Sequence, residues 1–444
     1  MNRKILQLAL PNIITNITVP LLGMVDTAIV GHLSESHIGA IAIGTQIFNL
    51  IYWNFGFLRM GTSGFTAQAY GAHRLEEAVR VFIRAFAIAL AIALLLIILQ
   101  YPIALLSEAI FNGSTSVIAM ALSYFYIRIW AAPATLGLYA IKGWFIGMQN
   151  SRLPMWIAIF INVINIICSL LFVLVFKMDI QGVALGTVIA QYSGLAIGLF
   201  FMVFRYGKIF RRRISTEFIV QTLRWKEMKQ FFKVNGDIFL RTVCLAAVFT
   251  FITSESGRIS DEILAVDALL MQFFMLFSYI MDGFAYAGES LVGRYIGARD
   301  RVSLVSTVRH LMGWGLGLTL LFTLLYAIGG TQFLSIFSDK ENVIEATRPY
   351  LFWVLIIPVC GFSAFLFDGI FVGATASRTM RNSMFIATAT FFLIYYTLTQ
   401  LLQVQTDFQR NNMLWSAFMV YLAARGIGQA FMLKRDIYGR VKDK

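Results

Sequence analysis

The sequence predicts an all-α polytopic membrane protein with twelve transmembrane helices in two pseudo-symmetric six-helix lobes. Three observations lead to this class: the composition, a series of long apolar runs, and an internal repeat. Of the 444 residues, 59% are hydrophobic and 13% are charged, whereas a soluble domain has about 25% charged residues. The mean hydropathy of +0.74 agrees with a chain that lies mostly in lipid.

The apolar runs have the length that a membrane helix needs. About 20 helical residues cross a hydrocarbon core of ~30 Å. Twelve segments meet this requirement, and short polar loops separate them. The predicted spans are residues 10–31, 38–58, 81–104, 118–147, 155–176, 182–204, 234–255, 263–287, 305–328, 346–373, 383–402 and 412–433.

The positions of Lys and Arg predict the orientation and the domain organisation. Residues 205–233 contain nine Lys and Arg against two Glu and join the two halves of the chain. Other cations lie at both ends of the chain and in alternate loops, as is typical of the cytoplasmic side. We therefore expect an N-lobe at 1–204, a basic cytoplasmic linker at 205–233, a C-lobe at 234–433 and a cytoplasmic tail at 434–444. Both termini are then cytoplasmic.

The two halves are related by an internal repeat with an offset of 226 residues. Residues 143–152 (GWFIGMQNSR) align with 369–378 (GIFVGATASR) with five identities in ten positions, and 71–72 fall on 297–298 at the same offset. Because each copy has an even number of spans, both copies enter the membrane from the same side. Such a parallel repeat, with a substrate site at the interface of the copies, favours a transporter over a channel.

Asp26 is the residue on which the functional interpretation depends. It is the acid of the first apolar run, and an intramembrane acid costs ~2.5 kcal/mol or more on insertion scales. An acid in this position usually faces a cavity or a partner, so we expect Asp26 to be an ion switch. Pro20 removes a backbone hydrogen bond six residues earlier, which indicates either a hinge or a static kink. The repeat aligns Asp26 with Ile252, so the ion chemistry is not expected to be duplicated.

Four further polar residues of the N-half are candidates to support Asp26. They lie in predicted spans 5 and 6 and are Asn162, Asn165, Ser169 and Thr187. A carboxylate with amide and hydroxyl oxygens around it suits a proton site, and hard oxygen ligands could equally hold Na⁺. The alternative is ordinary hydrogen bonding between helices.

Charged residues also occur inside other spans, and each has two interpretations. Lys142 either extends to the headgroups or competes as a tethered cation for an acid. At the start of span 7, Asn235 precedes Asp237 and Arg241, whose i,i+4 spacing allows an ion pair. Asp282 in span 8 and Asp368 in span 10 are expected to line a cavity or to form a second charge site; the repeat aligns Asp368 with Lys142.

Several function classes are excluded by motif. The chain has no P-loop, its four His have no metal spacing, and its three Cys lie apart inside apolar runs. We expect no metal and no cofactor other than the coupling ion. The net charge of +13 is placed to meet anionic lipid headgroups rather than nucleic acid. No ordered set of acid and nucleophile indicates a membrane enzyme.

Several long motifs resemble the multidrug and toxic compound extrusion (MATE) family over essentially the whole chain. They are VPLLGMVDTAIVGHL in the first span, LRMGTSGFTAQAYGA after span 2 and GVALGTVIAQ in span 6. Resemblance to the DinF-like branch rests on NGDIFLRT, MDGFAYAGE and LFDGIFVGATASRTMRNSM. The resemblance implies two lobes around a V-shaped cavity and export of amphipathic, often cationic compounds by antiport with H⁺ or Na⁺.

The resemblance also implies roles for individual residues. Asp26 matches the coupling carboxylate of the first helix, Asn165 and Thr187 match positions that support it, and Asp368 matches the acid of the tenth helix. Pro11 matches the proline that opens the first helix.

Two departures from the family pattern favour H⁺ over Na⁺. Ser169 stands where related proteins often have a second acid, and the span 7 acid of many sodium-coupled members is missing near Leu245. The sequence thus predicts a monomeric, proton-coupled multidrug antiporter of the bacterial inner membrane. The alternatives are a Na⁺-coupled antiporter and a lipid-linked precursor flippase of the same superfamily. A flippase would need a strongly cationic cavity for phosphates.

Overall fold

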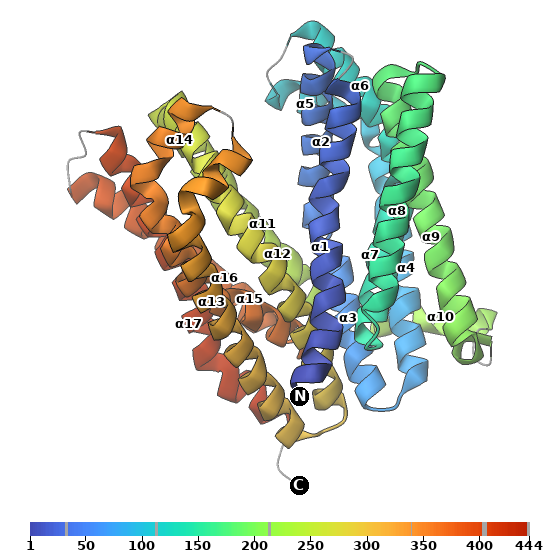
Figure 1. Cartoon of the computed structure of the whole chain (residues 1–444). Coiled ribbons are helices and arrows are strands. Elements are labelled where there is room, and N and C mark those ends of the chain that lie inside the picture. The colour runs from blue at the N-terminus through green and yellow to red at the C-terminus, as the bar shows by residue number, and fades with distance from the viewer. Residues whose placement is uncertain (32–33, 112–113, 212–214, 339, 402–405, 442–444) are drawn as a thin grey trace. The chain divides into compact units, whose positions relative to one another are not determined.

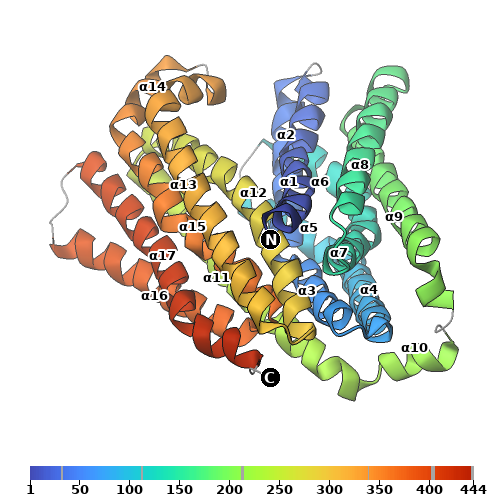
Figure 2. The same cartoon turned by 60° about the horizontal axis from the view of Figure 1, so that its bottom comes forward.

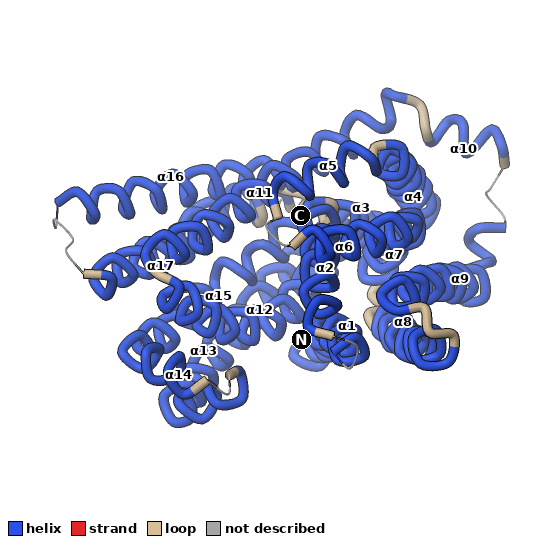
Figure 3. Tube along the Cα trace, turned by 90° about the horizontal axis from the view of Figure 1, so that it is seen from above, coloured by secondary structure: helices blue, strands red, loops and turns tan. Residues whose placement is uncertain are grey.

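In a computed structural model, the chain is described at residues 1–31, 34–111, 114–211, 215–338, 340–401 and 406–441. Helices form all of the regular structure in these ranges, and no strand occurs among them (Figure 3). Twelve of the helical stretches are long and apolar enough to cross a membrane. The predicted class and number of spans are therefore confirmed.

Seventeen α-helices follow one another along the chain. They are α1 (Asn2–Gly31), α2 (Glu35–Asn54), α3 (Phe57–Gly71), α4 (Leu75–Ile98), α5 (Gln100–Ile110), α6 (Thr115–Arg128), α7 (Ala132–Gly147), α8 (Arg152–Leu170), α9 (Asp179–Arg211), α10 (Thr216–Thr222), α11 (Trp225–Ile259), α12 (Asp261–Gly297), α13 (Arg301–Phe337), α14 (Glu341–Thr347), α15 (Leu351–Gly373), α16 (Ser377–Leu401) and α17 (Asp407–Asp436).

Many helices are longer than the predicted spans. The span predicted at 263–287 lies inside α12, which has 37 residues. Local capping sets its beginning, since Ser260 Oγ accepts a hydrogen bond from Ile263 N at 3.2 Å. The helix ends just before Arg299, whose φ of 54° is left-handed. Hydropathy therefore located an apolar part of this helix, whereas local capping determines where it begins.

The first compact unit, here the N-terminal unit, comprises residues 10–235. Within it α3 and α4 pack on α7, and α8 packs along α9 (Figures 1 and 2). Most of the predicted linker is helical, because α9 runs to Arg211 and α11 begins at Trp225. Arg84 of α4 holds this part of the chain by an ion pair to Glu227 at 3.5 Å, and it also pairs with Glu77 of its own helix at 2.8 Å.

The second compact unit, here the C-terminal unit, comprises residues 236–444 and also residues 1–9. Within it α12 packs on α15, and α15 and α16 pack on α17. The first residues of α1 bond to this unit, with Lys4 Nζ donating to Tyr295 Oη at 3.2 Å and Trp314 Nε1 donating to Asn2 Oδ1 at 3.2 Å. The domain boundaries expected at 204 and 234 and the cavity between the lobes remain predictions. Lys442 and Lys444, part of the expected basic tail, lie outside the described residues.

The repeat with its offset of 226 residues is visible in close backbone contacts. A Cβ at Gly143 would collide with the carbonyl of Arg59, and one at Gly369 would collide with the carbonyl of Ala285, which is the repeat equivalent of Arg59. Gly147 similarly lies against Ser63, at 2.7 Å from a Cβ to the carbonyl oxygen, and Gly373 lies against Glu289. The glycines are therefore needed because neighbouring backbones touch at equivalent points of both units.

Left-handed backbone recurs at the same offset. His73 (φ 56°) and Arg299 (φ 54°) follow the first glycine motif of each half, and Gln149 (φ 63°) and Thr375 (φ 52°) follow the second. None of these four residues is glycine, and each adopts a positive φ, which residues with a side chain adopt less readily. Conservation of this conformation in both halves supports a duplicated six-helix unit.

Candidate functional site

Asp26 is buried in the N-terminal unit, with 3% of its surface exposed. Its Oδ1 has no hydrogen-bond partner among the described residues. The charged group with an electrostatic influence on it is Arg128 of α6. Arg128 itself donates to Tyr124 Oη at 2.6 Å and lies 4.8 Å from the centroid of the Phe48 ring. Asp26 is thus a buried acid with one oxygen that lacks a hydrogen-bond partner among the described residues, and the nearby Arg128 is hydrogen-bonded to Tyr124.

The polar residues of spans 5 and 6 lie where α8 and α9 pack. Asn165 Nδ2 donates to Thr187 Oγ1 at 3.0 Å, and the Thr187 hydroxyl donates to Val183 O at 3.1 Å. Ser169 faces the same helix, because a Cβ at Gly186 would lie 2.6 Å from its Oγ. Within the described residues, Asn165 Oδ1 and Ser169 Oγ are buried without a partner. The structure therefore brings these three predicted residues together.

The fourth of these residues connects α8 to the first helix. Asn162 Nδ2 donates to Thr18 O at 3.0 Å. Pro11 and Pro20 both lie inside α1, which continues through them, and Thr15 Oγ1 donates to Pro11 O at 2.9 Å. A hinge at either proline remains a prediction.

Lys142 lies on α7 and is half-buried. Its electrostatic neighbour is a second cation, Arg59, rather than an acid. Gly143, the next residue, is where α7 touches the backbone of α3 at Arg59. This position brings two positive charges close together in the N-terminal unit.

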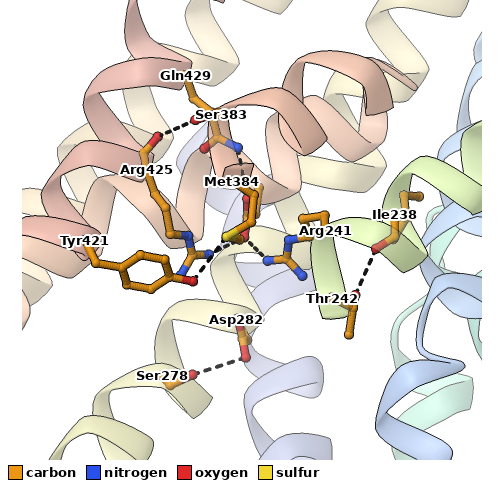
Figure 4. A network of polar contacts seen from close by, with 11 residues as sticks. Ile238, Arg241, Thr242, Ser278, Asp282, Ser383, Met384, Tyr421, Arg425 and Gln429 are labelled. Atoms are coloured by element: carbon orange, nitrogen blue, oxygen red, sulfur yellow. Dashed lines mark hydrogen bonds and ion pairs between the residues drawn. The ribbon is translucent and has the colours of Figure 1, made fainter. Parts of the chain in front are cut away.

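Asp368 of α15 is the centre of a charged cluster of the C-terminal unit, here called the Asp368 cluster. Arg241 of α11 and Arg425 of α17 point toward the same place (Figure 4), and both pair with Asp368 Oδ2, the second at 2.7 Å. Gln429 Nε2 donates to the other oxygen at 3.0 Å. All four side chains are buried. This acid is therefore compensated by two guanidinium groups.

The ion pair that the i,i+4 spacing allows between Asp237 and Arg241 does not form in the structure. Asp237 instead pairs with Arg381 at 2.6 Å and accepts from Ser377 Oγ at 2.8 Å. Arg241 pairs with Asp368 instead, because α15 brings that carboxylate within reach of its guanidinium group. Residue spacing along one helix carries no information about a partner on another helix.

Asn235 and Asp282, the last two candidates, lie in different units. Asn235 is buried at the end of the N-terminal unit and donates to Phe231 O at 2.8 Å; a Cβ at Gly61 would collide with its side chain. Asp282 is half-buried and accepts from Ser278 Oγ at 3.4 Å. Figure 4 shows it below the arginines of the Asp368 cluster, and it interacts electrostatically with Arg425.

Three ionisable residues that matter in the structure were missed. Arg128, Asp267 and Arg425 each lie inside a predicted apolar span. The rule that selected Asp26, an ionisable residue within such a span, also selects them. What it could not supply is the partner of each charge, because the partners come from helices far away in the sequence.

Comparison with known proteins identifies the family. The MatE family model matches residues 11–171 and 238–399. The chain belongs to the MatE family of membrane transporters. It is 37% identical to DNA damage-inducible protein F of Escherichia coli over 98% of this chain and 92% of that protein. The predicted resemblance to the DinF-like branch is confirmed.

More distant relatives and solved structures agree. A probable multidrug resistance protein NorM of Synechococcus is 22% identical, covering 78% of this chain and 74% of that protein. The crystal structure of the Vibrio cholerae MATE transporter VcmN in the bent form has a TM-score of 0.85 at 18% identity, covering 99% of this chain and 97% of that one. A crystal structure of MATE in the bent conformation also gives 0.85, at 17% identity, over 98% and 95% of the two chains.

Asp26, Asp368 and Asp237 can therefore do different chemistry. Asp26 can gain or lose a proton without breaking a hydrogen bond at Oδ1. Asp368 can do so only by leaving two buried arginines without their counter-ion, which is costly in a medium of low polarity. Asp237 is held in an ion pair with Arg381. Asp26 of the N-terminal unit can therefore change its protonation readily, whereas the charge of Asp368 in the C-terminal unit is balanced by two arginines.

Proposed function

We propose that this transporter is a multidrug efflux antiporter that exports amphipathic, often cationic compounds in exchange for H⁺. One observation carries the proposal: Asp26 is a buried carboxyl group with an oxygen that has no partner among the described residues. A proton binds to one lone pair of a carboxylate oxygen, and Oδ1 of Asp26 has lone pairs to which no described residue donates a hydrogen bond. Relatives named as multidrug resistance proteins support the class of substrate.

The charge of the C-terminal unit supports H⁺ rather than Na⁺. A Na⁺ ion at Asp368 would face Arg241 and Arg425, whose positive charges oppose its binding. Asn165, Ser169 and Thr187 provide oxygens in the N-terminal unit, and Na⁺ coupling through them is the alternative that the experiment below tests.

The proposed cycle uses the two states of Asp26. The deprotonated carboxylate favours an amphipathic cation taken from the cytoplasm. On the outside a proton neutralises Asp26, the attraction for the cation is lost, and the compound leaves. Asn162 connects α8 to the first helix at Thr18, so a change in the path of α1 at Pro20 would be transmitted to α8.

Location and assembly follow from the same proposal. The protein functions as a monomer in the bacterial inner membrane. Both termini lie in the cytoplasm, because the Lys- and Arg-rich loops fall on one side. A lipid-linked precursor flippase is less well supported: among the described residues six Asp and Glu are buried, against three Arg.

The test is efflux of a fluorescent cationic dye from proteoliposomes under an imposed pH gradient or an imposed Na⁺ gradient. Efflux driven by the pH gradient alone is expected. Efflux driven by Na⁺ alone would contradict the proposal and transfer the coupling role to the oxygens of α8 and α9. No efflux of dye with either gradient, together with binding of a phosphate-bearing lipid, would favour the flippase.

A further inference from the structure

Asp267 of α12 is an intramembrane acid that forms no ion pair among the described residues. It is buried, with 3% of its surface exposed. Its Oδ1 accepts hydrogen bonds from Asn411 Nδ2 at 2.9 Å and from Trp415 Nε1 at 2.7 Å, both on α17. Its Oδ2 contacts Ser256 Oγ of α11. These four residues are here called the Asp267 site, and all of the hydrogen-bonding groups that they bring to Asp267 are neutral.

The hydrogen bonds of Ser256 indicate how this site can hold a proton. Ser256 Oγ lies 2.7 Å from Ile252 O and also contacts Asp267 Oδ2. A hydroxyl has one hydrogen to donate, so it cannot serve both oxygens. When the hydroxyl donates to Ile252 O, the hydrogen between Ser256 and Asp267 has to come from the carboxyl group.

The site is complete with either charge of Asp267. The protonated acid donates from Oδ2 to Ser256, which donates to Ile252. After loss of the proton, the Ser256 hydrogen turns from Ile252 to Asp267, while Asn411 and Trp415 still donate to Oδ1. Ile252 O is a backbone acceptor in the middle of α11, where the helix supplies a hydrogen bond of its own. Binding and release of a proton therefore need only the rotation of one hydroxyl.

The charged neighbours leave Asp267 without a counter-ion among the described residues. On α11, Glu255 forms ion pairs with Arg410 at 2.7 Å and with Arg258 at 3.6 Å, so these two arginines pair with Glu255 rather than with Asp267. Asp267 has an electrostatic influence on Tyr350, which lies before α15.

Further acids lie on the other elements around this site. Glu262 of α12 and Asp407 of α17 act on Tyr350. Among the described residues no cation pairs with Asp267, in contrast to the two arginines that pair with Asp368.

The repeat explains why the site lies here. Ile252 is the repeat equivalent of Asp26, and its carbonyl accepts from Ser256. The C-terminal unit thus lacks an acid at the equivalent position of α11, yet an acid from α12 reaches the next turn of that helix. The alignment of Asp26 with Ile252 predicts that the ion chemistry is not duplicated at equivalent positions, and Asp267 lies at a position that is not equivalent to Asp26.

The geometry points to Asp267, with Ser256 as its hydrogen-bonding relay, as a second proton-binding site of this transporter. Its role in transport rests on the proposed proton coupling, whereas proton binding at the site does not. In the antiport cycle it would carry a proton in the C-terminal unit while Asp26 carries one in the N-terminal unit.

The test is an infrared pH titration of the purified full-length protein in lipid nanodiscs, which follows the C=O stretch of protonated carboxylic acids. In an Asp26→Asn background, the Asp26 signal is absent and a buried carboxylic acid band that titrates with pH is expected to remain. The double variant Asp26→Asn/Asp267→Asn is expected to lose that band. Asp261→Asn, an exposed acid at the start of the same helix, is the matched control and keeps it.

Trp415→Phe in the same background keeps the carboxyl group in case the double variant does not fold. It removes a donor that serves the carboxylate more than the acid, so the band should persist to higher pH than with Trp415 present. A band that is absent in the Asp26→Asn background, or present after loss of Asp267, or unmoved by Trp415→Phe, overturns the inference. Dye efflux driven by Na⁺ alone contradicts the proposed function and leaves the infrared result unchanged, so the two failures are distinguishable.

Discussion

The two halves of the chain share their backbone contacts and differ in their charges. Gly143 and Gly369 touch equivalent carbonyls, and left-handed residues recur at the same offset. The acids differ completely: Asp26 has an oxygen without a partner among the described residues, whereas Asp368 is held by two arginines. Close backbone contacts tolerate little change because no side chain can give way, while polar side chains can be exchanged one at a time. The comparison teaches that the duplicated scaffold permits unequal chemistry.

The largest effect is expected from Asp26→Asn on coupled transport. The amide cannot gain or lose a proton in the working range of pH, so dye efflux under an imposed pH gradient should fall to the level of empty liposomes. Thermal unfolding in detergent should remain close to wild type, because no hydrogen bond to Oδ1 is lost. Normal efflux by this variant would mean that proton coupling does not depend on Asp26, which would contradict the proposed difference between the acids of the two halves.

Asp368→Asn should have the largest effect on stability. It leaves Arg241 and Arg425 buried without their counter-ion, and removing one partner of a buried ion pair typically costs about 3–5 kcal/mol. The free energy of unfolding in mixed micelles measures the loss. Asp26→Asn is the control, because it makes the same change of a buried Asp to Asn without breaking an ion pair. Equal stability of both variants would mean that the Asp368 cluster does not hold the C-terminal unit together.

The shared scaffold predicts equal losses in the two halves. Gly143→Ala and Gly369→Ala each force a methyl group against a backbone carbonyl, for which overpacking costs of about 1–3 kcal/mol are typical. Gly313→Ala, where no atom lies within 4 Å of the new Cβ, is the control and should not destabilise. A loss at only one of the two paired glycines would contradict the equivalence of the backbone contacts.

The smallest effect is expected at the contact of α8 and α9. Thr187→Val removes the hydroxyl that accepts from Asn165 at 3.0 Å, and a buried hydrogen bond contributes about 1 kcal/mol. A melting temperature measured beside that of Asn165→Ala and of the double variant gives the coupling. If the single losses simply add, the two side chains act independently and the contact is not part of one polar site.

The sequence by itself determined the class of the protein, the twelve spans, the duplication and the family. These features follow from properties that accumulate along the chain: apolar runs of membrane-spanning length, alternating basic loops, and a single offset shared by separate motifs. Asp26 also belongs to this group, since a lone acid in an apolar run is visible without any partner. The association of Asn165 with Thr187 was expected from the family pattern, and the packing of α8 on α9 provides it.

Only the tertiary structure decided which charge compensates which. Arg241 lies four residues from Asp237, yet it pairs with Asp368, 127 positions away. Asp267 takes its donors from α11 and α17, so its spacing in the sequence carries no sign of them. The physical reason is that in lipid a polar group must find a partner within the protein, and helix packing, rather than sequence distance, brings that partner into reach.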